Sequence, residues 1–119
     1  MSDRVPAVIL GGTGYVAGEL LRLVLGHPRL TLAAIASDSQ PGEPVARAFP
    51  HLAAVCGDLR YDSIEHVKDL VAGLSRSAVL AAAPHGVSHT LLDSLLARTE
   101  AAGARPAVVD ISADFRFAD

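Results

Sequence analysis

The chain has 119 residues, of which 50% are hydrophobic and 19% are charged, with a formal net charge of −3. This length corresponds to one domain with a substantial core, and the composition excludes an intrinsically disordered chain. The basic residues form no cluster along the sequence and aromatic residues are few, which argues against a nucleic-acid-binding surface.

Hydrophobic patterning predicts that strands and helices alternate from the start of the chain. The first elements are a strand over residues 5–10, a helix over 16–26 and a strand over 30–36. The helix carries one apolar face, which we expect to be buried, formed by Leu20, Leu21, Val24 and Leu25. The almost unbroken apolar composition of the strands is typical of parallel strands covered on both faces.

The middle of the chain is less regular, and the alternation then resumes. The predicted segments are a polar loop at 37–44, a helical turn at 45–49, an ambiguous stretch at 50–57, a short strand at 59–61, a helix at 64–74 capped by Ser63, a strand at 79–83, a turn at 84–86, a helix at 88–101 and a strand at 107–111. Gly103 and Pro106 are expected to break the last helix, whose core-facing residues are predicted to be Leu91, Leu92, Leu95 and Leu96. The order predicts an α/β fold with a Rossmann-like, doubly wound parallel sheet and helices on both faces.

The turn between the first strand and the first helix is the most informative segment. Gly11 lies where the chain leaves the strand, Gly14 has no Cβ and allows a phosphate close to the backbone, and Ala17 packs the helix against the strand, a role that Gly18 can share. The first N–H groups of the helix and its dipole attract an anion. The sequence therefore predicts a dinucleotide diphosphate site formed by Gly11, Gly12, Thr13, Gly14, Tyr15 and Val16. The alternative is a tight turn without a ligand.

The loop after the second strand is expected to select the cofactor. Ser37 and Ser39 can donate hydrogen bonds to the additional phosphate of NADP, whereas Asp38 repels this phosphate unless it points away. A polar turn closed by local hydrogen bonds is the alternative. We predict contact of Ser37, Asp38 and Ser39 with the cofactor.

The turn after the strand at 79–83 contains Pro84, His85 and Gly86, which we expect to contact the nicotinamide side of the cofactor. Gly86 lets the backbone approach a ligand. His85 has the chemistry of an acid or base, but packing or a hydrogen bond within the loop is the favoured interpretation.

The last loop contains Ser112, Asp114 and Arg116. Arg116 can pair with a phosphate or carboxylate in bidentate geometry, and Asp114 can hold Arg116 instead. The sequence leaves substrate binding and purely structural pairing equally open for this loop.

The single cysteine, Cys56, excludes an internal disulfide and has no neighbour in sequence that would lower its pKa, so we interpret it as a packing residue. The histidines and acids lack metal-ligand spacing, so no metal site is expected. We find neither a signal-peptide pattern nor an apolar run of membrane-spanning length, and we predict a cytoplasmic protein without membrane contact.

The four loops together resemble the N-acetyl-γ-glutamyl-phosphate reductase family of arginine biosynthesis. The resemblance rests on Gly11-Gly12-Thr13-Gly14-Tyr15-Val16-Ala17-Gly18-Glu19-Leu20-Leu21-Arg22-Leu23, His27-Pro28, Ser37-Asp38-Ser39 with Gly42, Phe49-Pro50-His51-Leu52, Pro84-His85-Gly86-Val87-Ser88 and Asp110-Ile111-Ser112-Ala113-Asp114-Phe115-Arg116. It implies an NADPH-dependent oxidoreductase in which a cysteine thiolate attacks an acyl phosphate, phosphate leaves, and hydride reduces the thioester to an aldehyde.

The resemblance also implies that this chain contributes no catalytic residue. The family's nucleophile lies in a later Gly-Cys-Tyr-Pro-Thr segment and its catalytic histidine later still, and Cys56 does not match that segment. Residues 1–119 are thus expected to be the N-terminal NADP-binding domain of a two-domain reductase, inactive alone and assembled into a homo-oligomer through its C-terminal part. By position, Ser37 and Ser39 face the 2′-phosphate, residues 84–86 border the nicotinamide, and substrate binding falls to Ser112, Asp114 and Arg116.

Other assignments remain open at this point. The glycine turn also suits aspartate-semialdehyde dehydrogenase and aminoadipyl-phosphate reductase, although the segment from Ser112 to Arg116 favours the arginine or aminoadipate type. A non-catalytic NADP-sensing module is a candidate from a different functional class.

Overall fold

The structure, a computed structural model, describes residues 4–11, 15–37, 41–82 and 87–110. Its elements are, in chain order, β1 (Val5–Leu10), α1 (Tyr15–Leu25), β2 (Leu30–Ala36), α2 (Val45–Ala48), η1 (Pro50–Leu52), α3 (Ala53–Cys56), α4 (Ile64–Ala72), β3 (Arg76–Ala81), α5 (Val87–Ala102) and β4 (Arg105–Asp110). The described strands form one all-parallel sheet in the order β2-β1-β3-β4.

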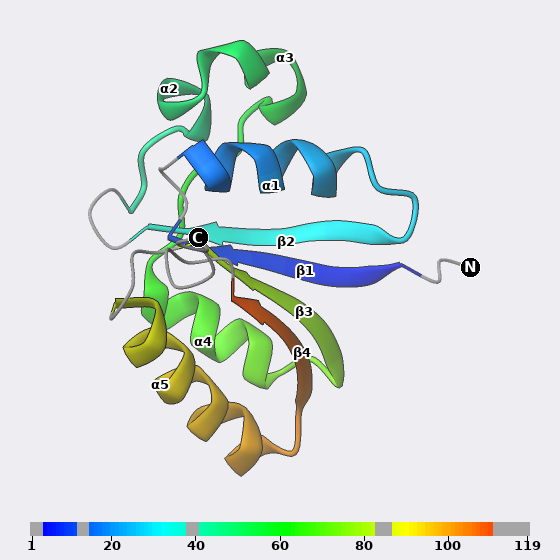
Figure 1. Ribbon diagram of the computed structural model, residues 1–119, viewed down its shortest axis with the longest axis vertical. Helices are drawn as coiled ribbons and strands as arrows, with labels where there is room; N and C mark the ends of the chain where they lie inside the picture. Colours follow the sequence, from blue (N-terminus) through cyan, green and yellow to red (C-terminus); the bar gives the residue numbers. More distant parts are fainter. Residues whose placement is uncertain (1–3, 12–14, 38–40, 83–86, 111–119) are drawn as a thin grey trace, which may run out of the picture.

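Helices cover both faces of this sheet, so the predicted doubly wound α/β fold is confirmed (Figure 1). Ala7 and Ile9 of β1 belong to the core beneath α1, α2 and α3, whereas Val8 and Leu10 belong to the core beneath α4 and α5. Successive strand residues point to opposite faces, and both faces of β1 are buried. This double burial explains the unbroken apolar run that predicted the strand.

The last two strands begin earlier than the sequence predicts. β3 starts at Arg76 rather than at 79, and β4 starts at Arg105 rather than at 107, because the two strands pair in register from Arg76 with Arg105 onward. Pro106 therefore lies inside a strand, and the predicted strand start at residue 107 was wrong, although α5 does end before Gly103 and Pro106 as predicted. β4 has a single strand neighbour in the described sheet, and a proline that cannot donate is tolerated in such a strand.

The connection between β2 and α4 departs most from the sequence prediction. The predicted short strand at 59–61 is wrong, since this part of the chain forms only isolated bridges, Pro44 with Arg60 and Ala36 with Asp62. The ambiguous stretch at 50–57 folds as η1 and α3. The ring of Phe49, which follows α2, packs against Gly18 of α1 so closely that a Cβ at Gly18 would lie 2.8 Å from the ring atom Cε1. Gly18 thus leaves room for the Phe49 ring to pack against α1.

Each of the two helix faces predicted to be buried includes one leucine that is exposed in the structure. Leu21 and Val24 of α1 and Leu92 and Leu95 of α5 are buried, but Leu25 and Leu96 are exposed, which contradicts the prediction for these two residues. The predicted cap of α4 is confirmed, because the hydroxyl of Ser63 accepts a hydrogen bond from the backbone N–H of His66 at 3.1 Å.

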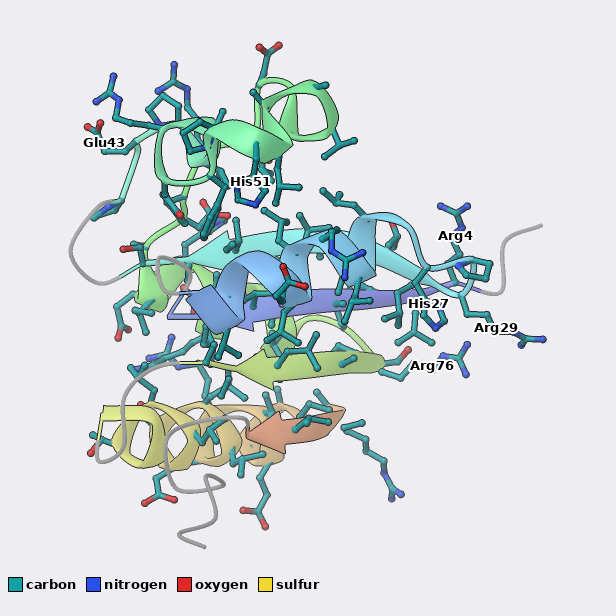
Figure 2. All side chains as sticks on the ribbon, turned by 45° about the horizontal axis from the view of Figure 1, so that its top comes forward. Arg4, His27, Arg29, Glu43, His51 and Arg76 are labelled. Carbon is teal, nitrogen blue, oxygen red and sulfur yellow. The ribbon has the colours of Figure 1, made fainter. Side chains whose placement is uncertain are left out.

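Each strand carries an arginine at its amino end. Arg4 and Arg29 immediately precede β1 and β2, and Arg76 and Arg105 begin β3 and β4. Since the strands are parallel, the arginines lie along one edge of the sheet, where Figure 2 labels Arg4, Arg29 and Arg76. The sequence, which shows no basic cluster, gives no sign of this row. Three of the four follow the C-terminal end of a helix, where a cation is favoured by the helix dipole.

Candidate cofactor-binding site

The carboxyl ends of β1 and β3 lie next to each other at the point where the strand order reverses. The chain leaves β1 through α1 on one face of the sheet and leaves β3 through α5 on the other face (Figure 1). In parallel α/β sheets, a crevice opens where neighbouring strands send their connections to opposite faces, and ligands bind there. The four loops singled out in the sequence all begin at this edge.

The β1–α1 turn begins with a glycine in a backbone conformation that favours this residue type. Gly11 has a φ of 80°, in the left-handed region that favours glycine, and its N–H donates to the carbonyl of Ala36 at 3.0 Å. α1 begins at Tyr15, so four residues, 11–14, join β1 to the helix. The first N–H groups of a helix have no partner within the helix and suit an anion. Gly12, Thr13 and Gly14 lie outside the described residues, and Val16 is partly exposed on α1.

The end of β2 is held by the segment that precedes α4. The N–H of Ser37 donates to the carbonyl of Asp62 at 3.1 Å, and the N–H of Asp62 donates to the carbonyl of Ile35 at 2.9 Å. Ser37 is buried by this arrangement. Asp38 and Ser39 lie outside the described residues. The structure thus places one of the three predicted cofactor-selecting residues at the carboxyl edge.

A cavity of about 360 Å³ adjoins Ser37 at this edge. Its lining comes from the end of β2, the following loop, the start of α4 and α5, and consists of Ser37, Pro41, Ser63, Ile64, Glu65, Lys68 and Leu91. A pocket with an apolar wall and a few polar groups is typical of a small-molecule site. The sequence predicts Ser63 only as a helix cap and gives no site role to Lys68. The signal for Lys68 was its place one turn after Ile64, on the buried side of α4.

Charged residues of α4 and α5 form a network beside this cavity. Lys68 Nζ lies 2.9 Å from Glu65 Oε2, and Arg98 reaches both Glu65 Oε1 at 3.0 Å and Asp69 Oδ1 at 2.7 Å. Lys68 is almost completely buried, so its pairing with Glu65 compensates part of its desolvation. The hydrogen bonds from Lys68 and then Arg98 lower the pKa of Glu65 below its ordinary value.

The network predicts an acid-dependent loss of stability. Because the pKa of Glu65 is lowered in the folded chain, its stabilisation is complete above the ordinary carboxyl pKa and disappears as the pH falls through the lowered value. Glu65→Gln is therefore expected to lower the urea midpoint at pH 7, and the difference from the unsubstituted chain is expected to shrink steadily in acid. A difference that stays constant across this range would show that ionised Glu65 does not stabilise the fold.

The segments that contain the remaining predicted site residues begin at the same edge. The N–H of Ala82, just after β3, donates to the carbonyl of Leu10 at 2.9 Å. The next element, α5, begins at Val87. Pro84, His85 and Gly86 connect these points, and Ser112, Asp114 and Arg116 follow the end of β4 at Asp110. Both groups lie outside the described residues. Their loops start from the carboxyl edge, which is the position that the strand order requires.

Cys56 packs in the core beneath α1, as the sequence predicts. Burial raises the pKa of its thiol, and desolvation together with the nearby Cys56 raises the pKa of Tyr61 to about 12. The raised pKa of the Cys56 thiol opposes a reactive thiolate. Iodoacetamide is therefore expected to modify Cys56 at least about tenfold more slowly in the native chain than in the urea-unfolded chain. Equal rates, measured by mass spectrometry at one pH, would contradict the packing role.

In the described part of the chain, no three His, Cys, Asp or Glu side chains gather as a metal site would require. No described helix has both the length and the hydropathy needed to cross a membrane.

Comparison with known proteins identifies the type of domain. The family model described as "Semialdehyde dehydrogenase, NAD binding domain" matches residues 6–119. An N-acetyl-gamma-glutamyl-phosphate reductase of Rhodospirillum rubrum is 41% identical over all of this chain and 32% of its own length. One of Pseudomonas savastanoi is 44% identical over 93% of this chain and 29% of its own length. The chain thus spans about a third of the length of these relatives.

The solved structures that resemble this chain share its fold at low sequence identity. RSP, a Rex-family repressor, superposes with a TM-score of 0.61 and 14% identity, covering 92% of this chain and 46% of RSP. RSP in complex with β-NAD⁺ and operator DNA gives a TM-score of 0.61 and 13% identity, covering 91% of this chain and 51% of RSP. At this identity the likeness establishes the fold alone.

Proposed function

Since the chain belongs to the family of semialdehyde dehydrogenase NAD-binding domains, we propose that it is the NADPH-binding portion of an N-acetyl-γ-glutamyl-phosphate reductase. The observation that carries the proposal is the 41–44% identity to reductases of that name over 93–100% of this chain. The chain spans about a third of these relatives, so catalysis is assigned to the whole polypeptide. The full reductase makes the semialdehyde from N-acetyl-γ-glutamyl phosphate.

The described residues fit a dinucleotide. The left-handed Gly11 lets the chain turn sharply into α1, whose first amides suit a diphosphate. The cavity beside Ser37 has the size and the mixed lining that an adenosine group needs. When bound, the reduced nicotinamide supplies the hydride for aldehyde formation.

The predicted site residues other than Asp38 each receive a role under this proposal. Amides of residues 11–16 bind the diphosphate, Ser37 and Ser39 donate to the 2′-phosphate, and the turn at 84–86 borders the nicotinamide. Arg116 orients the acyl phosphate through its guanidinium, with Ser112 and Asp114 positioning this loop. The nucleophilic cysteine is assigned to the polypeptide beyond the part matched here.

Calorimetry with the 119-residue chain tests the choice of cofactor. NADPH is expected to bind at least about tenfold more tightly than NADH, because hydrogen bonds to the charged 2′-phosphate each contribute about 1.5–3 kcal/mol. Tighter binding of NADH would overturn the preference for NADP. Failure of both nucleotides to bind a folded chain would overturn the cofactor site itself.

A chimera tests the reaction. In it, this chain replaces the matching third of the Rhodospirillum rubrum reductase. The chimera is expected to oxidise NADPH only when N-acetyl-γ-glutamyl phosphate is present, whereas the 119-residue chain alone is expected to be inactive. A folded chimera that binds NADPH without turnover would contradict the assignment to a reductase.

A further inference from the structure

We infer that Glu65 and Lys68 form a hydrogen-bonding pair that recognises the amino-bearing edge of an adenine base in the cavity beside Ser37. The inference rests on the proposed function, which places the adenosine group of the cofactor in this cavity. It goes further because it names the residues that distinguish adenine from other purines. The base is then selected by specific hydrogen bonds as well as by apolar contact.

The pair lies in the wall of the cavity at the start of α4. Glu65 and Lys68 are three residues apart in the first two turns of this helix, so they share one side of it. Both residues line the cavity, and Lys68 Nζ lies 2.9 Å from Glu65 Oε2. The cavity wall therefore carries an N–H donor directly beside an oxygen acceptor.

Lys68 has donors left for a ligand. It is the only lysine of the sequence, and only 7% of its surface is exposed. Within the described residues, its ammonium group hydrogen-bonds to Glu65 alone, although an ammonium carries three N–H donors. A buried donor without a partner is unfavourable, so the remaining N–H groups favour a ligand that accepts a hydrogen bond.

The carboxylate of Glu65 is oriented before a ligand arrives. Arg98 of α5 contacts Glu65 Oε1 at 3.0 Å, whereas Lys68 contacts the other oxygen, Oε2. Arg98 is itself fixed by Asp69, whose Oδ1 lies 2.7 Å away. Each carboxylate oxygen accepts more than one hydrogen bond, so Oε2 still has a free lone pair for a ligand donor.

The chemistry of the pair matches the amino-bearing edge of adenine. On this edge the exocyclic amino group donates and the neighbouring ring nitrogen N1 accepts. The amino group can donate to Glu65 Oε2 while N1 accepts from Lys68 Nζ, so both members of the pair are satisfied at once. Hypoxanthine and guanine reverse this edge, because their carbonyl oxygen accepts and their N1–H donates. Their carbonyl would face the carboxylate and their N1–H the ammonium group, which selects against them.

Apolar residues complete a site for a purine ring. Pro41, Ile64 of α4 and Leu91 of α5 line the same cavity. Apolar side chains of this kind pack against a ring, while a few polar groups fix its orientation. The carboxylate of Glu65 disfavours a phosphate group at the pair, so we assign Lys68 to the base and not to the 2′-phosphate.

Calorimetry with NADPH and with its hypoxanthine analogue, in which a carbonyl oxygen replaces the amino group, tests the inference. The 119-residue chain is expected to bind NADPH at least about tenfold more tightly than the analogue, because the analogue leaves the buried donor of Lys68 unpaired. Lys68→Met keeps the length of the side chain and removes its donors. This variant is expected to bind NADPH at least about tenfold more weakly and to prefer it over the analogue by less than about threefold.

Arg22→Met is the matched control. Arg22 also belongs to an ion pair between residues three apart on a helix, since its Nη2 lies 3.0 Å from Glu19 Oε1, but this pair is on α1 and outside the cavity. The control is expected to change neither the affinity for NADPH nor the preference over the analogue.

The outcomes separate this inference from the proposed function on which it rests. Equal binding of NADPH and its analogue by the unsubstituted chain would overturn the recognition of the base and leave the cofactor site intact. This comparison needs no variant, so it decides the question even if Lys68→Met does not fold. An unchanged preference for NADPH in folded Lys68→Met would assign the recognition to other groups.

Two further results would also overturn the inference. If folded Lys68→Met loses affinity for NADPH but not for NADH, Lys68 binds the 2′-phosphate instead of the base. If the folded, unsubstituted chain binds none of these nucleotides, the cofactor site itself is wrong, and the inference falls with the proposed function.

Discussion

Gly14→Val is expected to lower the affinity of this chain for NADPH by at least about 100-fold, which corresponds to roughly 2.7 kcal/mol. Only three residues separate Gly11, at the end of the sheet, from Tyr15, the first residue of α1. A diphosphate bound at the helix start must therefore contact the backbone of this short connection. A branched side chain there occupies the phosphate's space and removes charge-assisted hydrogen bonds of about 1.5–3 kcal/mol each.

The matched control for this substitution is Gly73→Ala at the end of α4. A Cβ at Gly73 would lie 3.5 Å from the carbonyl oxygen of Leu70, an ordinary contact, and the position is remote from the carboxyl edge. We expect unchanged NADPH affinity for this variant. Calorimetry of both variants, with circular dichroism to confirm folding, separates a local effect from general instability. An unchanged affinity in folded Gly14→Val would place the diphosphate elsewhere.

The first half of the fold could be predicted because its signals are local. β1 and β2 have the predicted bounds, and α1 begins and ends within one residue of its prediction. An unbroken apolar run and a helical apolar stripe are both readable within a short window. The starts of β3 and β4 could not be read in this way, since Arg76 and Pro106 have little strand preference. Pairing between the two strands extends them, and this pairing is not visible in either segment alone.

In the candidate site, too, the residues that follow a local sequence signal were predicted, and those that tertiary contacts bring in were not. Gly11 and Ser37 were identified because each follows directly on a strong strand signal, and the carboxyl edge collects such residues. Lys68 and the pocket wall formed by α4 were missed because they approach Ser37 only through the bridge between Ala36 and Asp62. The row of arginines could not be predicted from the sequence for the same reason, because it forms only when the parallel strands bring distant residues together.

Gly18→Ala is expected to destabilise the chain by about 1–2 kcal/mol, although alanine is the better helix former. The helix preference favours alanine over glycine by about 0.5–1 kcal/mol, whereas overpacking of a buried contact costs about 1–3 kcal/mol. At Gly18 the added Cβ would lie 2.8 Å and 3.0 Å from ring atoms of the buried Phe49. The steric cost therefore exceeds the gain in helix preference. The urea midpoint of Gly18→Ala is expected to be lower than that of the unsubstituted chain.

Gly26→Ala supplies the contrast, because its Cβ would meet only the carbonyl oxygen of Arg22 at 3.6 Å. This variant is expected to change the free energy of unfolding by no more than about 0.5 kcal/mol. Phe49→Leu removes the ring and should be destabilising by itself, yet Gly18→Ala should then cost little in the Phe49→Leu background. A double-mutant cycle is expected to give a favourable coupling of about 1 kcal/mol or more. Additive effects would mean that the ring moves aside freely, and that Phe49 does not fix α1 against the sheet at the turn where the nucleotide is expected to bind.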